Sequence, residues 1–395
     1  MKTARKRILI INNNMHIGGV QKALVGLLDS LKDKYDITLL LFRAQGELMN
    51  EIPKQIQIVE TKGQYRYLGM SQQECANLID RCFRAFYATI AKQIGVKWSI
   101  KLIDMLSHKD KLGKFDAAIS YLHCASQKSF YGGTAEYALG YSDADKKICY
   151  VHCDYVNSGM SSEYSNDVYC RFDSIACVSD SVRKQFISVL PQLESRTISI
   201  INPLKVNEVV ELSRQNPYKY DQTYLNCLSV ARLSDEKGID RFIRAMKAVN
   251  SSSIRYYVVG EGQYRRKIER TICETGLEQQ VFLLGEDVNP YKYMINADIL
   301  VVPSYHEAAP VVFQEALVVG LPVFTTCTLS AAEMISDMYG FIVNNDEESM
   351  TDKLREINEH REMIQHAKQC LTEYHYDLSK FAYTFSKMIE EQEEN

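Results

Sequence analysis

Long apolar runs are missing from this sequence of 395 residues. A bilayer-spanning helix needs about 20 consecutive apolar residues, and no uncharged stretch approaches that length, so we expect no transmembrane helix. Residues 1–7 are basic, but only the short apolar run 8–11 follows before a run of asparagines. A signal peptide has a longer apolar region and a small-residue cleavage site. We therefore interpret residues 7–12 as a first β-strand and expect a cytoplasmic chain.

A Cys-x-x-Cys pair is also missing. The 11 cysteines are scattered along the chain, and an odd number does not fit a fully paired disulfide framework. The closest cluster, Cys149, His152 and Cys153, lacks the fourth ligand of a zinc site. We expect free buried thiols in a reducing compartment, with no metal and no other cofactor.

The composition excludes disorder and collagen-like repeats, because 46% of the residues are hydrophobic and 24% are charged. The length fits two domains. Residues 1–204 carry a net charge of +6 and residues 205–395 a net charge of −10. The positive excess falls in residues 81–114, so we expect the first half to meet an anionic partner.

Two successive series of apolar strand patterns, each strand followed by a helical pattern, organise the chain. The strands are apolar along their whole length, which is typical of parallel strands covered on both faces. The first series comprises residues 7–12, 36–42, 56–59, 115–122, 147–152 and 174–178; the second comprises 225–231, 255–259, 281–284, 299–302 and 322–325. Residues 72–112 are predicted to be mostly helical.

This pattern predicts two doubly wound α/β domains in tandem, which face each other across a ligand-binding cleft. We expect an N-terminal domain over 1–204 and a C-terminal domain over 205–377, with a hinge in the polar segment 203–224. Residues 378–395 should form a C-terminal helix and an acidic tail, and a return of this helix to the first domain is one option.

The stretch 297–322 carries the most informative polar residues. A strand ends at 302–304, the next loop holds His306 and Glu307, and Pro310 lies where a helix should begin. Glu315 follows inside that helix. The unpaired N–H groups of the first helical turn form a ready anion site, and carboxylates suit sugar hydroxyls. These features favour a sugar nucleotide as ligand, although Glu315 could instead be a solvated helix residue.

A second polar cluster, residues 230–238, follows the first strand of the second domain. Arg232 and Lys237 lie on one strand-to-helix loop, where both could reach a diphosphate. The alternative is that they are surface charges paired with Asp235 and Glu236.

Taken together, these motifs resemble the retaining glycosyltransferases of the GT-B fold, family 4 (group 1). The resemblance covers nearly the whole chain. Its motifs are the Gly18-Gly19 loop, the Arg-x4-Lys loop of 232–237, the Val-Val-Gly-Glu-Gly turn of 258–262, the Pro-Ser-x-x-Glu approach of 303–307 and the Glu-x7-Glu element of 307–315. The sequence departs from the family at Ala308 and Ala309, where glycine is usual, and at 330–333, which replaces a glycine-rich turn.

The resemblance implies a role for each matching residue of the second domain. Glu307 contacts the transferred sugar, and Glu315 holds the ribose hydroxyls. Arg232 and Lys237 neutralise the leaving diphosphate. The donor set is completed there by the first turn of the helix, Pro310 and Val311, and by Val288 in the base-reading loop 285–289.

In the first domain, the resemblance implies that Gly18 and Gly19 allow the backbone to approach the diphosphate. His152 matches the histidine that hydrogen-bonds the donor sugar, so the predicted catalytic set is Glu307, His152, Arg232 and Lys237. A satisfied core histidine is the alternative for His152.

Two other motifs point elsewhere. Asp143-Ala144-Asp145 matches the metal-binding Asp-x-Asp of another glycosyltransferase fold, but we predict that it lies in a polar loop and occurs by chance. The sequence Gly260-Glu261-Gly262 begins like a dinucleotide fingerprint, but Arg265 stands at the third glycine position. We therefore do not expect a dehydrogenase.

Residues 81–114 mix aromatic and basic side chains, a composition that can bind an anionic lipid surface. The candidates for contact with membrane or acceptor are Arg81, Arg84, Lys97, Trp98 and Lys101. The alternative is an amphipathic helix that packs its apolar face on the sheet.

The expected function is a retaining, metal-independent hexosyltransferase that uses a nucleoside-diphosphate sugar, with UDP the expected nucleotide. The expected acceptor is a glycan, lipid-linked, in capsule, exopolysaccharide or O-antigen synthesis, with the enzyme cytoplasmic or peripheral on the inner face of the cell membrane. We expect no nucleic-acid partner. The alternatives are a GT-B-fold sugar-nucleotide epimerase and a non-catalytic nucleotide-sugar-binding protein.

Overall fold

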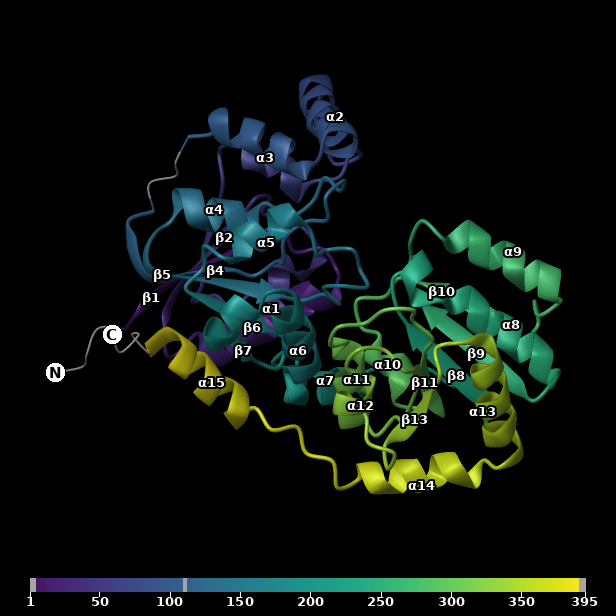
Figure 1. The fold of residues 1–395 in the computed structure, drawn as a ribbon. Coiled ribbons are helices and arrows are strands. Elements are labelled where there is room, and N and C mark those ends of the chain that lie inside the picture. Colours follow the sequence, from purple (N-terminus) through teal and green to yellow (C-terminus); the bar gives the residue numbers. More distant parts are fainter. Residues whose placement is uncertain (1–4, 109–111, 391–395) are drawn as a thin grey trace. The chain divides into compact units, whose positions relative to one another are not determined.

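The computed structural model describes residues 5–108 and 112–390. Lys109 and Lys111 of the predicted basic segment, and the predicted acidic tail after Glu390, lie outside these residues. The described chain forms two compact units (Figure 1). Unit 1 comprises the described residues of Met1–Pro203 and Leu378–Asn395, and unit 2 comprises Leu204–Asp377.

Unit 1 is built on a parallel sheet of seven strands, in the order β3-β2-β1-β4-β5-β6-β7. In β1, an interior strand, Ile8 pairs with Ile37 on one side and with Ala117 on the other. The strands are β1 (Arg7–Asn12), β2 (Asp36–Leu41), β3 (Gln57–Glu60), β4 (Lys114–Ser120), β5 (Asp143–Val151), β6 (Ser174–Cys177) and β7 (Thr197–Ser199).

Helices connect these strands. They are α1 (Gly19–Leu31), α2 (Leu78–Gln93), α3 (Val96–Met105), α4 (Thr134–Tyr141), α5 (Glu163–Tyr169), α6 (Asp180–Val189) and α15 (Ser379–Glu390), with the 3-10 helices η1 (Glu47–Glu51), η2 (Gln64–Gly69) and η3 (Pro191–Arg196). None of the helices in the described residues has both the length and the apolar character needed to cross a membrane.

Unit 2 is built on a second parallel sheet, of six strands, in the order β10-β9-β8-β11-β12-β13. The strands are β8 (Leu225–Val230), β9 (Ile254–Val259), β10 (Val281–Gly285), β11 (Ile299–Val302), β12 (Val323–Thr326) and β13 (Gly340–Val343). The helices are α7 (Val206–Ser213), α8 (Ile239–Val249), α9 (Arg265–Thr275), α10 (Tyr291–Met294), α11 (Val311–Val318), α12 (Ala331–Met334), α13 (Glu347–Glu359) and α14 (Glu362–Leu371), with the 3-10 helix η4 (Asp235–Lys237).

Both faces of the second sheet are covered. One core cluster joins alternate strand residues such as Cys227 and Val301 to Phe242 of α8 and Leu354 of α13. Strand residues of the opposite parity, for example Leu300, are also fully buried. Burial on both faces is why these strands are apolar along their whole length. The predicted fold class, two doubly wound α/β units, is confirmed.

Two details of the sequence interpretation are wrong. Asp143-Ala144-Asp145 does not lie in a loop: it begins β5, where Asp143 pairs with Lys114 and Lys114 Nζ lies 2.6 Å from Asp145 Oδ1. The predicted hinge 203–224 is not simply a polar linker, because α7 occupies its first part. Asn289 donates a hydrogen bond to the carbonyl of Leu212 in α7, so this segment packs in unit 2.

The C-terminal helix α15 packs in unit 1. Phe381 and Phe385 are fully buried there, and the ring of Phe385 meets Tyr35 edge-on with centroids 5.8 Å apart. Lys34, next to Tyr35, donates a hydrogen bond to Ser386. The last described helix therefore completes the core of the unit that begins the chain.

We predict that Phe385→Ala lowers the free energy of unfolding of unit 1 by about 3–5 kcal/mol, because it leaves a cavity under α15. Urea denaturation followed by circular dichroism would measure the change. Tyr383→Ala is the matched control on the exposed side of the same helix, and it should shift stability by less than about 0.5 kcal/mol. Equal stability of the two variants would contradict this packing.

Candidate functional site

The polar residues of unit 2 gather where the strand order reverses. The chain runs outward from β8 to β9 and β10, then crosses back to β11 beside β8. Parallel neighbours end at the same edge of the sheet, so the loop after β8 and the loop after β11 lie next to each other. Such a switch point is the usual ligand site of a doubly wound sheet.

Lys237 and Glu307 join these two loops. Lys237 Nζ lies 2.6 Å from Glu307 Oε1, and the hydroxyl of Ser304 donates to the same oxygen at 2.7 Å. The side chains are 23% and 11% exposed. Asp235 pairs instead with Lys267. The structure thus brings together two of the predicted catalytic residues, and the alternative that Lys237 pairs with its neighbouring acids is wrong.

Arg232 behaves differently, because the alternative pairing holds for it. Its Nη2 lies 2.9 Å from Glu236 Oε1, and the side chain is 73% exposed. Burial of Glu236 is outweighed by hydrogen bonds from Ser234, from its own backbone and from Arg232, which lower the pKa of this carboxyl. Arg232, Ser234 and Glu236 line a cavity of about 430 Å³ together with Leu233 and Gln263.

Two glycines hold the Arg232 loop in place. Gly260 has a φ of +145°, and a Cβ there would lie 1.9 Å from the carbonyl oxygen of Ala231. A Cβ on Gly262 would lie 2.2 Å from the carbonyl oxygen of Leu233. The sequence analysis identified this turn as a family motif but assigned no role to it. The structure shows that it packs backbone against backbone beneath Arg232, which only glycine permits.

Glu315 is a buried residue of α11. It is 2% exposed, and the hydroxyl of Tyr291 donates to its Oε1 at 2.8 Å. The alternative of a solvated helix residue is therefore wrong. Pro310 is the N-cap residue of α11, so the helix begins at Val311, and a proline side chain offers no hydrogen bond to the first turn.

The predicted base-reading loop, residues 285–289, begins at Gly285 with a φ of +80°. Val288 is 69% exposed. Asp287 anchors the loop, because it accepts hydrogen bonds from the backbone of Asn289 at 2.9 Å and from Tyr293 at 3.0 Å. The backbone of this loop is therefore fixed while the side chain of Val288 faces solvent.

In unit 1, Gly18 and Gly19 follow β1 and begin α1. Gly18 has extended backbone (φ −173°), which any residue can adopt. A Cβ on Gly19 would meet no other atom within 4 Å. No contact within the described chain therefore requires glycine at position 19. The approach of a diphosphate to this backbone stays a prediction.

His152 follows β5 and is only half satisfied. Its ring hydrogen-bonds the backbone of Tyr121, while its Nε2 is buried without a partner among the described residues. Burial lowers the pKa of His152 to about 3, with a smaller contribution from His123, and the bond to Tyr121 opposes this shift. The imidazole is therefore neutral. The alternative of a fully satisfied core histidine does not hold.

Sequence reasoning missed the neighbours of His152. Tyr121 and His123 follow β4, Tyr150 lies near the end of β5 and His152 follows it. The ring centroids of Tyr121 and Tyr150 lie 4.7 and 5.4 Å from that of His152. The rings of Tyr121 and Tyr150 are 4.8 Å apart. Among the described residues, His123 Nδ1 and the Tyr150 hydroxyl have no partner, and burial lowers the pKa of His123 to about 4. The repeated Tyr-x-His spacing was the available signal.

The two cysteines that lie next to Tyr150 and His152 in the sequence are free. Cys149 and Cys153 are buried, as expected. Over residues 5–108 and 112–390, no group of three or more His, Cys, Asp or Glu side chains is placed to hold a metal ion.

The predicted basic segment forms α2 and α3. Helix α2 buries little beyond Tyr87 and Ala91, and its apolar residues Leu78, Ile79, Phe83 and Phe86 are exposed. The alternative, in which α2 packs its apolar face on the sheet, is therefore wrong for these residues. Helix α3 does bury one face.

The predicted contact residues of this segment differ in their surroundings. Arg84 donates to the carbonyl of Met70 at 2.6 Å, so it is engaged within unit 1. Trp98 is exposed, and Lys101 Nζ lies 5.4 Å from its ring centroid. Arg81 and Lys97 are also exposed.

Solved structures share this fold over the full chain. The crystal structure of Anabaena Alr3699/HepE in complex with UDP and glucose matches with a TM-score of 0.69, over 98% of this chain and all of that one, at 15% identity. At this identity, the likeness concerns the fold alone. It places the chain among proteins built from two doubly wound α/β units.

Residues 213–370 match the model of the family Glycosyl transferases group 1. This match confirms the predicted resemblance over most of unit 2. The lipopolysaccharide glucosyltransferase WaaG of Escherichia coli K12 is 35% identical over 132 residues, which cover 32% of this chain and 34% of that protein.

A second relative comes from Campylobacter jejuni. It is the N-acetylgalactosamine-N,N'-diacetylbacillosaminyl-diphospho-undecaprenol 4-alpha-N-acetylgalactosaminyltransferase, 33% identical over 124 residues, which cover 31% of this chain and 34% of that protein. The chain spans about half, or less, of the length of the curated relatives it matches.

We predict that the stability of unit 1 falls as the pH drops below about 6.5, because the unfolded chain then protonates histidines that stay neutral in the folded unit. With folded pKa values of about 4 for His123 and about 3 for His152, each contributes up to ~1.4 kcal/mol per pH unit until its folded pKa is reached. Urea denaturation at pH 7, 6 and 5 measures this loss.

The double variant His123→Gln/His152→Gln isolates the two histidines from the carboxylates. Its stability should depend less steeply on pH than that of the unchanged protein over the same range. Parallel curves for the two proteins would show that these histidines are not held neutral.

Proposed function

We propose that this chain is a hexosyltransferase that moves a sugar from a nucleoside-diphosphate donor to a glycan acceptor. The observation that carries the proposal is the partly buried Lys237–Glu307 pair at the switch point between β8 and β11. This pair brings together two kinds of group. Lys237 is a cation that can bind a diphosphate, and Glu307 is a carboxylate that can accept hydrogen bonds from sugar hydroxyls. The family match over 213–370 includes both residues.

The proposed donor is a UDP-sugar. In unit 2, Lys237 and Arg232 provide positive charge for the diphosphate, and the first turn of α11, which follows Pro310 and begins at Val311, adds backbone N–H groups. Glu315 holds the ribose hydroxyls, and the loop that carries Val288 reads the base. UDP itself is suggested by its presence in the complex of the structural neighbour.

The proposed reaction is retaining and needs no metal. The bond between the anomeric carbon and the diphosphate oxygen breaks, and the acceptor oxygen bonds to the same face of that carbon. The acceptor proton passes to the leaving diphosphate, whose negative charge is stabilised by Lys237 and Arg232. Glu307 orients the sugar and favours the developing positive charge; it is not a covalent nucleophile.

Neutral His152 fits the donor-sugar role that the resemblance gives it. Since its ring donates to the backbone of Tyr121, Nε2 carries a lone pair and can accept a hydrogen bond from a sugar hydroxyl. His123 and Tyr150 offer further neutral polar atoms near His152. Buried polar atoms without partners cost about 1–3 kcal/mol each, which favours a ligand that satisfies them.

The proposed acceptor is a lipid-linked glycan in capsule, exopolysaccharide or O-antigen synthesis. The names of the two relatives, which refer to lipopolysaccharide and to an undecaprenol-linked sugar, support this choice. A sugar-nucleotide epimerase is the alternative, and it would release free nucleotide without an acceptor. A non-catalytic binding protein would hold the donor and release nothing.

We predict that UDP binds the protein and that Lys237→Met weakens this binding by about 10–100-fold, because a charged hydrogen-bond donor is lost. Isothermal titration calorimetry measures the affinity, and a thermal-shift screen of UDP-, GDP-, ADP- and dTDP-sugars chooses the donor. Lys267→Met is the matched control, since Lys267 is half exposed and pairs with Asp235 and Asp240 instead of Glu307.

Two outcomes would count against this function. If no nucleotide sugar binds or shifts the melting temperature, the donor assignment fails. If UDP is released at the same rate with and without a glycan acceptor, the result favours the epimerase over the transferase.

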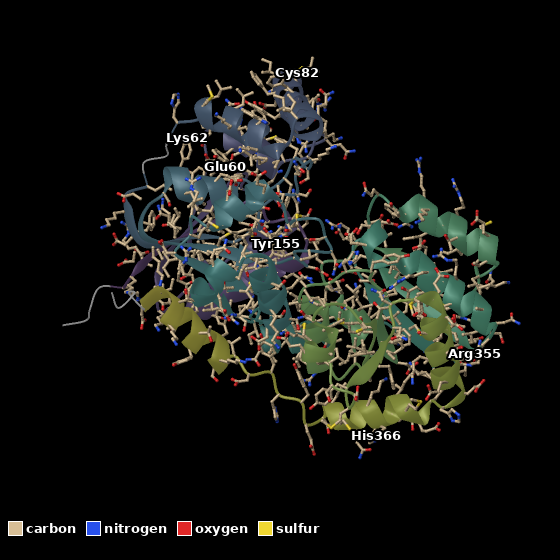
Figure 2. The ribbon with its side chains drawn as sticks, viewed as in Figure 1. Glu60, Lys62, Cys82, Tyr155, Arg355 and His366 are labelled. Atoms are coloured by element: carbon tan, nitrogen blue, oxygen red, sulfur yellow. The ribbon has the colours of Figure 1, made fainter. Side chains whose placement is uncertain are left out.

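We further propose that α2 and α3 place the protein on an anionic membrane surface, on the inner face of the cell membrane. One side of α2 exposes Leu78, Ile79, Phe83 and Phe86 around a cavity of about 490 Å³. Cys82, labelled in Figure 2, belongs to the same exposed group. The cations Arg81, Lys97 and Lys101 on α2 and α3 supply the attraction to anionic lipid.

We predict that the protein sediments with vesicles that contain phosphatidylglycerol and that Phe83→Ser/Phe86→Ser greatly reduces the bound fraction. Met338→Ser, which removes an exposed apolar residue of unit 2, is the control and should bind as the unchanged protein does. High salt should weaken binding, because exposed charges are screened. Absence of binding to anionic vesicles would refute the membrane proposal.

A further inference from the structure

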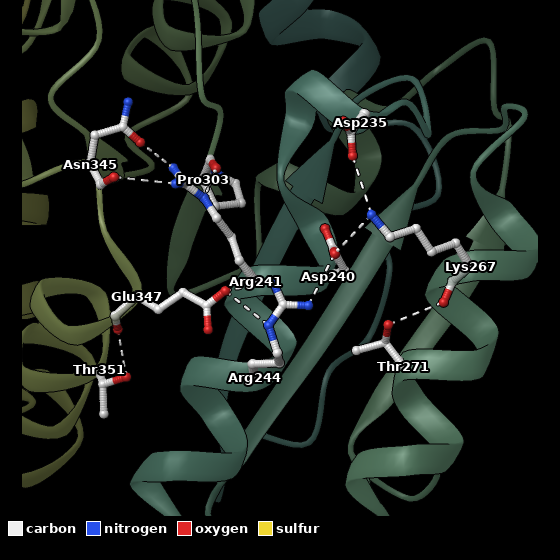
Figure 3. A network of polar contacts seen from close by, with 10 residues as sticks. All are labelled: Asp235, Asp240, Arg241, Arg244, Lys267, Thr271, Pro303, Asn345, Glu347 and Thr351. Atoms are coloured by element: carbon white, nitrogen blue, oxygen red, sulfur yellow. Dashed lines mark hydrogen bonds and ion pairs between the residues drawn. The ribbon is translucent and has the colours of Figure 1, made fainter.

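Arg241 is a buried cation next to the candidate site, and no motif assigned it a task. It lies in the first turn of α8, four residues after Lys237, and is 2% exposed. Figure 3 shows its guanidinium directed at Pro303 and Asn345, away from the carboxylates of the neighbouring ion pairs. A charge this deeply buried normally has a compensating partner.

The partners of Arg241 are backbone oxygens of the loop that carries Glu307. Its Nε donates to the carbonyl of Pro303 at 2.8 Å, and its Nη2 donates to the carbonyl of Ser304 at 3.1 Å. The guanidinium also lies over the ring of Tyr305, 4.0 Å from its centroid. One side chain therefore contacts three successive residues just before Glu307.

Asn345 holds the same loop from the other side. Its Oδ1 accepts from Arg241 Nη2 at 2.5 Å, and its Nδ2 donates to the carbonyl of Tyr305 at 2.9 Å. Gly238, with a φ of +61°, lets the loop come this close, because a Cβ there would lie 2.2 Å from the carbonyl oxygen of Pro303. Arg241 and Asn345 form a clamp on residues 303–305.

The nearby acidic side chains are paired with other cations. Asp240 pairs with Arg244 and Lys267, and Glu347 pairs with Arg244 (Figure 3). Among the described residues, no carboxylate lies within ion-pair distance of Arg241. Its charge is therefore matched to carbonyl dipoles of this loop and to the side chain of Asn345. Removal of the guanidinium would take away the donor to the buried Pro303 carbonyl, whereas the Ser304 carbonyl would keep its hydrogen bond from Thr326.

We propose that Arg241 is a positioning residue for Glu307, acting through the backbone of residues 303–305. The clamp fixes Ser304, whose hydroxyl donates to Glu307 Oε1 at 2.7 Å, so that the carboxylate meets Lys237 in one arrangement. Lys237 comes just before Gly238, and Arg241 follows in the first turn of α8. The same short segment therefore positions Lys237 directly and Glu307 through the loop 303–305. This role rests on the proposed glycosyl transfer and adds a residue to it.

The test compares Arg241→Met, Arg241→Lys and Asn345→Ala with Arg244→Met. Arg244 lies one turn further along α8 and is the matched control, because it is charged and paired but does not contact the loop. Turnover with UDP-sugar and acceptor, and the affinity for UDP alone, are measured on folded protein checked by thermal unfolding. UDP lacks the sugar that Glu307 contacts, so its affinity reports the fold of the nucleotide site.

We expect Arg241→Met to lower kcat by about tenfold or more, while the affinity for UDP changes by less than about threefold. Arg241→Lys should recover part of the loss, and Asn345→Ala should reproduce part of it even if Arg241→Met does not fold. Arg244→Met should stay near the unchanged kcat. In a Glu307→Gln background, Arg241→Met should have little further effect, because both changes act through one carboxylate.

Three results would overturn the proposal: an unchanged kcat in folded Arg241 and Asn345 variants, an equal loss of kcat and of UDP affinity, or full additivity with Glu307→Gln. A wild-type protein that binds UDP-sugar but transfers nothing would instead count against the proposed function. The two failures are therefore distinguishable.

Discussion

The candidate site of unit 2 depends on one ion pair, Lys237 with Glu307, which bridges the loops after β8 and β11. Both side chains are largely removed from water, so each needs the other to offset the loss of hydration. Ser304 adds a second donor to the same oxygen of Glu307. An incoming anion would compete with Glu307 for Lys237, while the hydrogen bond from Ser304 would still position the carboxylate of Glu307. The pair is thus a structural contact between the two loops, and Lys237 is the half of it that an anion could engage.

That arrangement requires close contact between backbones. Gly238 admits the carbonyl of Pro303, and Gly260 and Gly262 admit the carbonyls of Ala231 and Leu233. Backbone contacts leave little room for rearrangement, so the backbone that carries the charged side chains is fixed before any ligand arrives. Preorganised groups of this kind lose little energy to reorganisation when charge develops. The glycines therefore matter for the electrostatics of the site as well as for the path of the chain.

The sequence predicted the two sheets well, because strands buried on both faces leave continuous apolar runs. It also assigned Lys237 and Glu307 to one donor site, through the family resemblance. The structure shows that the two are in contact because β8 and β11, the strands before their loops, are neighbours in the sheet. It did not predict α7, whose helical pattern lies inside a polar segment, or the early start of β5 at Asp143. Arg241 could not be found, because its partners lie some 60 and 100 positions away and are mostly backbone atoms without a sequence signature.

The two units offer different chemistry. Unit 2 presents cations and carboxylates at its switch point, which suits a charged diphosphate and the hydroxyls of a ribose. Unit 1 presents histidines held neutral by burial, with the Tyr150 hydroxyl beside them. Such neutral donors and acceptors suit an uncharged sugar, because they satisfy hydroxyls without leaving a charge unpaired.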